Sequence, residues 1–391
     1  MRLLASWELG LGYGHVATLA PVCRALRAGG HHLTLAARTP QTALRLERDA
    51  FDLVVQSPRF AGAVPRRETL TYGQVIAAGG LADAAGAIPL VRQWLDFFEQ
   101  LAPDALLAEH APLSLLAAHV AGLPARRLGP TFVAPRARDA GASLQPWAGH
   151  DAAELAAAQL PADRAVREAC RHFGAPELAG LDELLAGAPL HSLAWAELDH
   201  YGPDGTASYY GPLIGIEADA RPDWPEGEGP RTLVYLPFDR AGSAIVVRAL
   251  RALGWPALWH SASSPGEALP GNIRYSAAPI DLAAVAREAA LYVGRGSYGA
   301  SASMLAAGVP QLLLPDTLES LLLTYRLRLA GAAQSQAVSA GADAVRAALC
   351  RAAGDDRIRA QAARIAARHA NHRADTMTGL LVRNLLSGIA D

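Results

Sequence analysis

Short hydrophobic runs alternate with helix-like stretches along the first half of the chain. The first run, 1–7, has the length and bulk of a buried strand. Apolar residues then recur near helical spacing over 19–28, and the glycine pair at 29–30 ends that helix. A further apolar run at 32–37 completes a strand–helix–strand unit, which is typical of a parallel sheet. Similar runs follow at 51–55, 104–108 and 125–128.

The alternation restarts in the second half of the chain, after an acidic stretch rich in proline and glycine. Strands are expected at 232–236, 258–260, 273–275 and 291–293. The acidic stretch has the composition of a linker. The sequence therefore predicts two doubly wound α/β halves facing a cleft, where ligands of such pairs usually bind.

Composition narrows the functional classes. The 391 residues suit two domains, and 51% apolar with 18% charged residues is typical of a soluble globular protein. A net charge of −2 gives no general attraction to nucleic acid or to an anionic membrane. We expect no signal peptide and no transmembrane segment. The three cysteines lie far apart without metal-ligand spacing, so we expect a cytoplasmic protein without disulfides.

All 35 basic residues are arginine, because the chain contains no lysine. This excludes Schiff-base chemistry on lysine, lysine-bound pyridoxal phosphate and the lysine of a phosphate-binding P-loop. The bias towards Ala, Arg, Gly and Leu is also what GC-rich coding produces.

A glycine-rich loop, Gly10-Leu11-Gly12-Tyr13-Gly14-His15, separates the first expected strand from the first helix. Loops that leave the carboxyl ends of parallel strands form the ligand crevice of such sheets. His15 would therefore lie at a helix start in that crevice, where it could act chemically. The alternative is that the glycines only allow close packing and that His15 is a half-exposed helix-start residue.

A second glycine-rich segment follows the expected strand 291–293 and leads into a helix expected at 302–307. Free N–H groups at a helix start, the helix dipole, two serine hydroxyls and Arg295 all favour an anion with phosphate-like oxygens. A pyrophosphate group is the natural occupant. The alternative is a tight strand-to-helix turn with a surface arginine.

The next short strand, 311–315, leads into a carboxylate and hydroxyl groups beside the same cleft. Asp316, Glu319 and Ser320 could hydrogen-bond the hydroxyls of a sugar. Equally, Asp316 or Thr317 could cap the helix that contains 321–329.

These features follow one another in an order that resembles the nucleotide-sugar-binding half of GT-B glycosyltransferases of the UDP-glycosyltransferase and macrolide glycosyltransferase families. The resemblance rests on the glycine-rich helix start, Ala-Ala-Gly-Val-Pro at 306–310, a short strand, a proline and a carboxylate. The first half is similar to the opening of those enzymes through Gly14-His15, Pro21, Leu26 and 30–34. The middle region is unmatched.

The resemblance implies an α/β GT-B fold with two Rossmann-like domains. Residues 1–215 would bind the acceptor and 216–231 would be the linker. Residues 232–370 would bind the nucleotide sugar, and a helix within 371–391 would pack back toward the N-terminal domain.

In these families the histidine of the first loop is a general base that a carboxylate on a later strand orients. By resemblance, the base here is His15 and the carboxylate is Glu109, where the family usually has aspartate. Neutral His15 would take the acceptor's hydroxyl proton as the oxygen attacks the anomeric carbon, which gives an inverting transfer without a metal ion. His110 is the neighbouring alternative, and because adjacent strand residues point to opposite faces, only one of the two should face the cleft.

The other residue roles also come from the resemblance. A nucleotide-diphosphate sugar, UDP- or TDP-linked, would be the co-substrate, with no further cofactor, and a hydroxyl-bearing small molecule or a lipid would be the acceptor. We expect no nucleic-acid partner, and a homodimer stays open. The expected sites are Arg295, Gly296, Ser297, Gly299 and Ser301 for the diphosphate; Asp316, Glu319 and Ser320 for the donor sugar; Ile280 for the nucleobase; and Tyr13, His110 and Phe132 for the acceptor.

The chain departs from the family pattern at four places, and those around Pro237 and Ser320 keep a helper-protein function open. Arg295 replaces a histidine that is common in the family, and Ser320 stands where a glutamine often occurs. The loop 237–243 replaces a simpler Gly/Ser turn, and Glu109 is one methylene longer than the usual aspartate. The alternatives are a non-catalytic nucleotide-sugar-binding helper protein and a nucleotide-sugar 2-epimerase. The long Ala-rich region at 131–190 argues against an epimerase, which needs no acceptor pocket.

Overall fold

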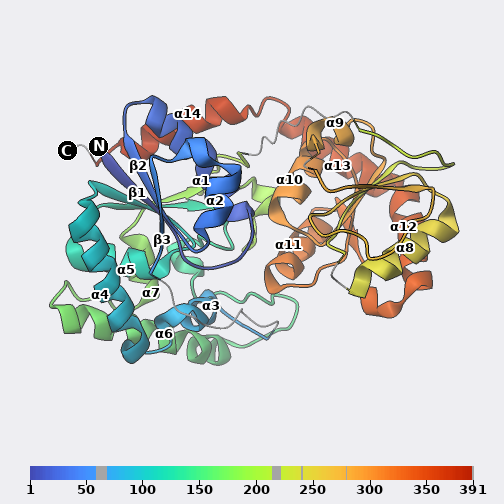
Figure 1. The fold of residues 1–391 in the computed structure, drawn as a ribbon. Coiled ribbons are helices and arrows are strands. Elements are labelled where there is room, and N and C mark those ends of the chain that lie inside the picture. Colours follow the sequence, from blue (N-terminus) through green and yellow to red (C-terminus); the bar gives the residue numbers. More distant parts are fainter. Residues whose placement is uncertain (59–67, 214–221, 239–240, 279, 390–391) are drawn as a thin grey trace. The chain divides into compact units, whose positions relative to one another are not determined.

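The computed structural model describes residues 1–58, 68–213, 222–238, 241–278 and 280–389, which form two compact units (Figure 1). Unit 1 consists of Met1–Leu213 together with Arg373–Asp391, and unit 2 consists of Ile214–His372. Parts of three predicted segments lie outside the described residues: 216–221 of the expected linker, 239–240 of the loop after Leu236, and Pro279 before the expected nucleobase residue.

Unit 1 is built on a parallel sheet of six strands in the order β3-β2-β1-β4-β5-β6. Because all its strands are parallel, their carboxyl ends meet at one edge, where Trp7 of β1 pairs in register with Glu109 of β4. The strands are β1 (Arg2–Trp7), β2 (His32–Ala37), β3 (Leu53–Gln56), β4 (Ala105–Glu109), β5 (Ala125–Gly129) and β6 (Leu190–Ser192).

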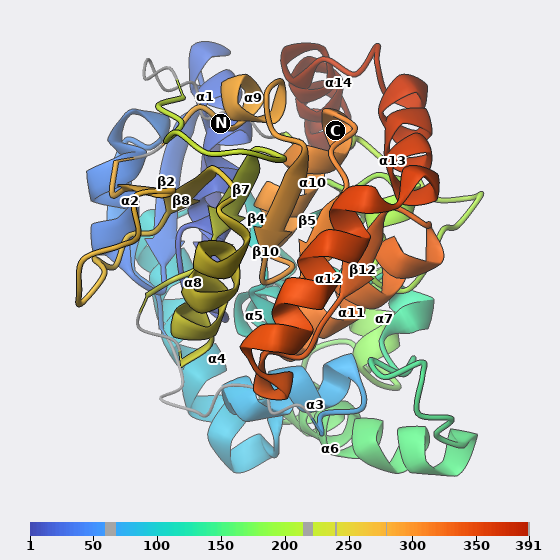
Figure 2. The same ribbon diagram turned by 90° about the vertical axis from the view of Figure 1, so that its right-hand side faces the viewer.

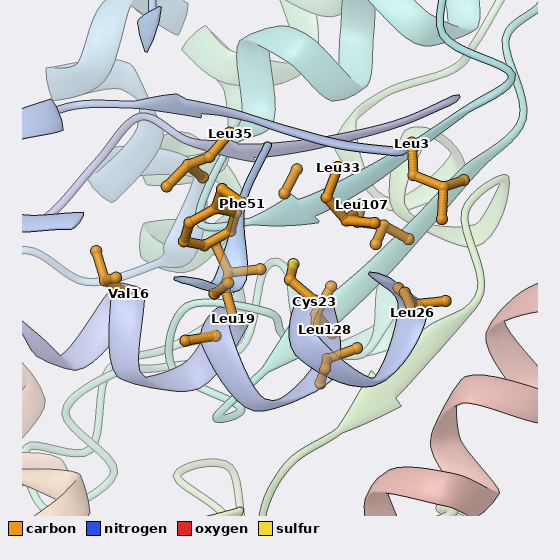
Figure 3. Packing of buried hydrophobic residues seen from close by; sticks show 14 of the residues in the cluster. Leu3, Val16, Leu19, Cys23, Leu26, Leu33, Leu35, Phe51, Leu107 and Leu128 are labelled. Atoms are coloured by element: carbon orange, nitrogen blue, oxygen red, sulfur yellow. The ribbon is translucent and has the colours of Figure 1, made fainter. Parts of the chain in front are cut away.

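Helix α1 covers this sheet with an apolar face. Val16, Leu19, Cys23 and Leu26 recur at helical spacing and point toward strand residues such as Leu33 (Figure 3). The other helical segments of the unit complete its layers: α1 (Gly14–Ala28), α2 (Pro40–Leu46), η1 (Arg48–Ala50), α3 (Tyr72–Ile76), η2 (Ala77–Leu81), α4 (Ala84–Leu101), α5 (Pro112–Ala121), η3 (Ala137–Asp139), α6 (Ala152–Phe173), α7 (Leu181–Ala186), η4 (Ala196–Leu198) and α14 (Ala374–Leu386).

The last helix, α14, belongs to unit 1 although the whole of unit 2 precedes it in the chain. It packs on α1. Asn384 Nδ2 donates a hydrogen bond of 2.8 Å to Tyr210 Oη, and Arg126 Nη2 donates one of 2.9 Å to the Ser387 carbonyl just after the helix. The chain thus returns to the unit in which it began.

Unit 2 repeats the architecture with a parallel sheet in the order β12-β11-β10-β7-β8-β9. Helices α8 and α12 lie side by side over its sheet (Figure 2). The elements are β7 (Thr232–Tyr235), α8 (Ala241–Leu253), β8 (Ala257–His260), β9 (Ile273–Ser276), α9 (Leu282–Ala286), β10 (Leu291–Gly294), α10 (Tyr298–Ala306), β11 (Gln311–Leu313), α11 (Leu318–Leu329), β12 (Ala333–Ser335), η5 (Val338–Ala340), α12 (Ala342–Gly354) and α13 (Asp356–Arg368).

Across the described residues, no single helix is long and apolar enough to cross a bilayer. Two consecutive segments, Tyr72–Leu81 and Ala84–Leu101, meet that criterion together, and they are bent by 70°.

A buried carboxylate ties the end of β1 to helix α5. Glu8 is 1% exposed, and its carboxylate accepts hydrogen bonds from the backbone N–H groups of Leu113 (2.9 Å) and Ser114 (2.5 Å). These are first-turn groups, which have no carbonyl partner within the helix. Burial nevertheless raises the pKa of Glu8 from 4.5 to about 8.

This raised pKa predicts a specific pH dependence of stability. Between about pH 4.5 and 8 the native state holds a proton on Glu8 that the unfolded state has lost, so stability falls as the pH rises through this window. We expect the melting temperature of the wild type to fall more between pH 5 and 8 than that of Glu8→Gln, which cannot ionise there. Parallel melting curves for the two proteins would contradict this.

Candidate functional site

The glycine-rich loop places His15 over the carboxyl end of the unit 1 sheet. His15 is the second residue of α1, and its Nδ1 lies 2.8 and 3.0 Å from the two carboxylate oxygens of Glu109, the last residue of β4. The Glu109 side chain is 1% exposed and that of His15 is 13% exposed. The structure thus brings these two sequence-predicted residues together.

An aromatic ring supports the imidazole from one side. The indole of Trp7 stacks on the His15 ring, with centroids 5.0 Å apart and planes 21° apart. Trp7 is fully buried, and its register partner on β4 is Glu109. The sheet therefore fixes both the face and the Nδ1 edge of the histidine.

Glu109 and His110 both lie beside His15, although alternating strand side chains would turn only one of the two toward the same face. His110 follows the last residue of β4 and has a φ of +49°, so the alternation of strand side chains ends there. Its ring lies 5.8 Å from that of His15 and 6.2 Å from that of Tyr72. Both residues therefore lie against the His15 imidazole.

His110 is a buried polar residue, 5% exposed. Within the part of the chain that the structure describes, neither of its ring nitrogens has a hydrogen-bond partner. Burial, with His15 and Arg38 nearby, holds the pKa of His110 well below its usual range, so this imidazole is neutral. A buried polar group without a hydrogen-bond partner is rare in folded proteins, and a role in binding a ligand is one explanation for it.

The other two predicted acceptor residues are engaged elsewhere. The Tyr13 hydroxyl donates to Glu47, which also pairs with Arg24. Phe132 is 6% exposed, and its ring lies 5.6 Å from that of His200. Tyr13 therefore ties the glycine-rich loop to the segment before η1, and Phe132 packs inside the unit.

The second glycine-rich segment forms the start of α10 in unit 2. The helix begins at Tyr298, four residues before the expected start. Ser297 is its N-cap without a side-chain capping bond, and the first intrahelical bond runs from the Ser301 N–H to the Ser297 carbonyl. The N–H groups of the first turn, including that of Gly299, therefore precede the hydrogen-bonded part of the helix.

Gly296 is needed for this turn. Its φ is +81°, and a Cβ there would lie 2.8 Å from Thr324 Oγ1 and 3.0 Å from the Ser320 carbonyl. The glycine therefore allows the turn to pack closely against α11.

Two predicted serines do not present their hydroxyls at the surface. Ser301 is fully buried in α10. Ser320 is 3% exposed, and its hydroxyl accepts from the N–H groups of Asp316 (3.1 Å) and Thr317 (3.0 Å). Thr317 and Ser320 form the capping box of α11, which gives the Ser320 hydroxyl a structural task.

Arg295 and Asp316 lie on neighbouring loops, after β10 and after β11. Arg295 Nε is 3.5 Å from Asp316 Oδ1, and both side chains are about one third exposed. Glu319 is half-buried in the first turn of α11. Ile280 is 8% exposed and precedes Asp281, the N-cap of α9. The predicted donor residues thus lie on the loops that follow β9, β10 and β11 and at the starts of helices α10 and α11.

Comparison with solved structures identifies the architecture. CalG4, the calicheamicin glycosyltransferase, matches with a TM-score of 0.73 at 17% identity, over 100% of this chain and 99% of CalG4. The spinosyn rhamnosyltransferase SpnG, complexed with thymidine diphosphate, matches with 0.68 at 18% identity, over 97% and 100%. SnogD from Streptomyces nogalater matches with 0.58 at 18% identity, over 97% and 99%. The chain has the GT-B fold.

No protein-family model matches this GT-B chain, and no curated protein matches its sequence. At 17% and 18% identity these matches show a shared fold, and a shared fold does not determine a shared chemistry. Among the described residues, no group of three or more His, Cys, Asp or Glu side chains is arranged to hold a metal ion.

Two residues beside His15, Trp7 and Gly10, were not predicted from the sequence as part of this GT-B site. In the sequence, Trp7 is one more apolar residue of a buried strand. Its stacking on His15 follows only from the pairing of β1 with β4. In the sequence, Gly10 has the character of a turn residue. Its packing against the His15 imidazole follows only from the path of the loop.

Proposed function

We propose that the chain is an inverting glycosyltransferase that moves a sugar from a nucleotide diphosphate to a hydroxyl group of a small-molecule or lipid acceptor, without a metal ion. The observation that carries the proposal is the contact between His15 Nδ1 and the buried Glu109 carboxylate. A carboxylate on Nδ1 fixes the imidazole tautomer with Nε2 as the basic nitrogen.

The proposed reaction begins at the acceptor. His15 Nε2 takes the hydroxyl proton while the acceptor oxygen forms a bond to the anomeric carbon of the donor. The bond from that carbon to the diphosphate oxygen breaks on the opposite side, which inverts the configuration. Glu109 stabilises the imidazolium that results, and the Trp7 face adds a cation–π contact.

The donor is assigned to unit 2 and the acceptor to unit 1. Arg295, Gly296, Ser297, Gly299 and the first turn of α10 would hold the diphosphate, where positive charge and N–H groups stabilise the negative charge of the leaving group. Asp316 and Glu319 would bind sugar hydroxyls. Ile280 would contact the nucleobase through its backbone.

His110 is the acceptor residue that the geometry favours most. A neutral imidazole can both donate and accept a hydrogen bond, and His110 lies beside the proposed base. Its two nitrogens have no hydrogen-bond partner among the described residues, and burying such a group costs free energy. A hydrogen bond from an acceptor hydroxyl would offset that cost.

Thymidine diphosphate is the nucleotide favoured by the similar structures, because the SpnG structure contains it. A second SpnG structure contains the spinosyn aglycone, which supports a small-molecule acceptor over a lipid. We therefore rank TDP-sugars above UDP-sugars as donors.

A thermal-shift series with TDP-, UDP- and GDP-sugars tests the donor class. A ligand at 100 times its Kd stabilises the native state by about 2.7 kcal/mol, so the matching nucleotide should raise the melting temperature by several degrees. The GDP-sugars serve as the control and should leave it nearly unchanged. Absence of a shift with every nucleotide sugar would contradict the proposed function.

A further inference from the structure

Gly10 lies between β1 and the start of α1, with its open side turned to the His15 ring. A Cβ built on Gly10 would lie 2.7 Å from His15 Cε1 and 3.3 Å from Cδ2, and closer still to Nε2. These distances are shorter than non-bonded carbon atoms tolerate. Any side chain at position 10 would therefore force the imidazole or the loop to move.

The imidazole has little room to yield. Glu109 holds its Nδ1, and the fully buried Trp7 covers one face of the ring. A shift away from a new Cβ would lengthen the contact with Glu109 or slide the ring off the indole.

The loop is also held on the strand side of Gly10. The Leu9 N–H donates to the His110 carbonyl (3.1 Å), and Trp7 Nε1 donates to the Leu9 carbonyl (2.7 Å). Arg38 Nη1 donates to the Glu8 carbonyl (2.8 Å). These three bonds fix the backbone up to the residue before Gly10.

We propose that Gly10 is a positioning residue for His15: its missing side chain provides the space in which the imidazole keeps Nδ1 on Glu109 and presents Nε2 to the acceptor hydroxyl. This inference rests on the proposed function of His15 as the base. In this role Gly10 acts through its lack of a side chain, and not only through the backbone conformations that a glycine allows in a turn.

Gly12 provides a matched control within the same loop. Both glycines have a positive φ, +80° for Gly10 and +99° for Gly12, so alanine at either position carries the same kind of backbone strain. A Cβ on Gly12 would meet no atom within 4 Å. The two alanine variants therefore differ in the contact with His15 and share the strain.

The experiment compares Gly10→Ala with Gly12→Ala. We expect both variants to lose a few degrees of melting temperature through the shared backbone strain, and Gly10→Ala to lose more because its Cβ also collides with the His15 ring. Gly10→Ala should lower kcat by roughly 10²-fold, the cost of a small misplacement of a reacting group, with the KM for the donor unchanged. Gly12→Ala should keep kcat within about threefold. Equal kcat losses in the two variants would overturn the proposal.

A double variant tests whether Gly10 acts through His15. In a His15→Ala background the further change Gly10→Ala should have no effect on kcat, because the group it positions is gone. If the double variant is slower than His15→Ala by the factor that Gly10→Ala shows alone, Gly10 does not act by positioning His15.

The imidazole signals of His15 in NMR spectra give a readout that does not need turnover. These signals, assigned with His15→Ala, should shift in Gly10→Ala and stay in place in Gly12→Ala. If they shift as expected while the wild type transfers no sugar, the positioning holds and the glycosyltransferase proposal fails. If they do not shift, the positioning inference fails whatever the activity.

Discussion

Replacing His15 with alanine is expected to lower kcat by roughly 10²–10⁴-fold, which is the usual worth of a positioned general base. Without the imidazole, the acceptor hydroxyl must lose its proton to water as it attacks. Donor binding should persist, since the proposed donor residues belong to unit 2. Initial rates with a saturating TDP-sugar, together with the donor Kd from calorimetry, measure the two effects separately.

Glu109→Gln is the companion variant. Glutamine keeps the size of the side chain and removes the charge that stabilises the imidazolium, so kcat should fall by less than in His15→Ala. A non-catalytic helper protein would behave differently. His15→Ala would bind the donor and activate a partner enzyme as the wild type does. On their own, neither the wild type nor the variant would transfer sugar. That result would contradict the proposed glycosyltransferase function and support the helper-protein function.

Replacing Gly299 with alanine is expected to weaken donor binding at least about tenfold while the free protein becomes more stable. A Cβ on Gly299 would meet nothing within 4 Å, and alanine is a better helix former than glycine by about 1 kcal/mol. If the diphosphate lies on the first turn of α10, however, the added methyl group blocks its approach to the backbone N–H. Calorimetric titration with TDP and a melting curve measure both quantities.

Gly379→Ala is the matched control, because Gly379 lies within α14 of unit 1 and a Cβ there would find its nearest atom at 3.8 Å. It should gain stability for the same reason and bind TDP as the wild type does. If Gly299→Ala also binds TDP normally, the glycine-rich segment is only a tight turn and the diphosphate lies elsewhere.

The alternation of strands and helices could be predicted from the sequence because strands buried on both faces of a parallel sheet read as continuous apolar runs. β6 and β12 were not predicted, since Leu190–Ser192 and Ala333–Ser335 contain no run of apolar residues, whereas the equally short β11 lies in one. The start of α10 was placed too late because Ser297 and Gly299 have the composition of a loop.

The candidate site was predictable to a similar extent. That His15 and Glu109 meet follows from the order of β1 and β4 and from the family resemblance. That His110 joins them could not be predicted, because it depends on one backbone angle after the strand ends. Packing against Trp7 and Gly10 is likewise a property of the assembled sheet and loop.

The return of α14 to unit 1 makes unit 2 an insertion within the first unit. During synthesis, unit 2 emerges from the ribosome before the helix that covers part of unit 1, so unit 2 can fold while unit 1 still lacks its last helix. The same topology sets the rule for building chimaeras. Exchanging unit 2 for the corresponding unit of another GT-B protein needs two junctions, near Leu213 and near Arg373, and a single crossover would leave unit 1 with a foreign last helix against α1.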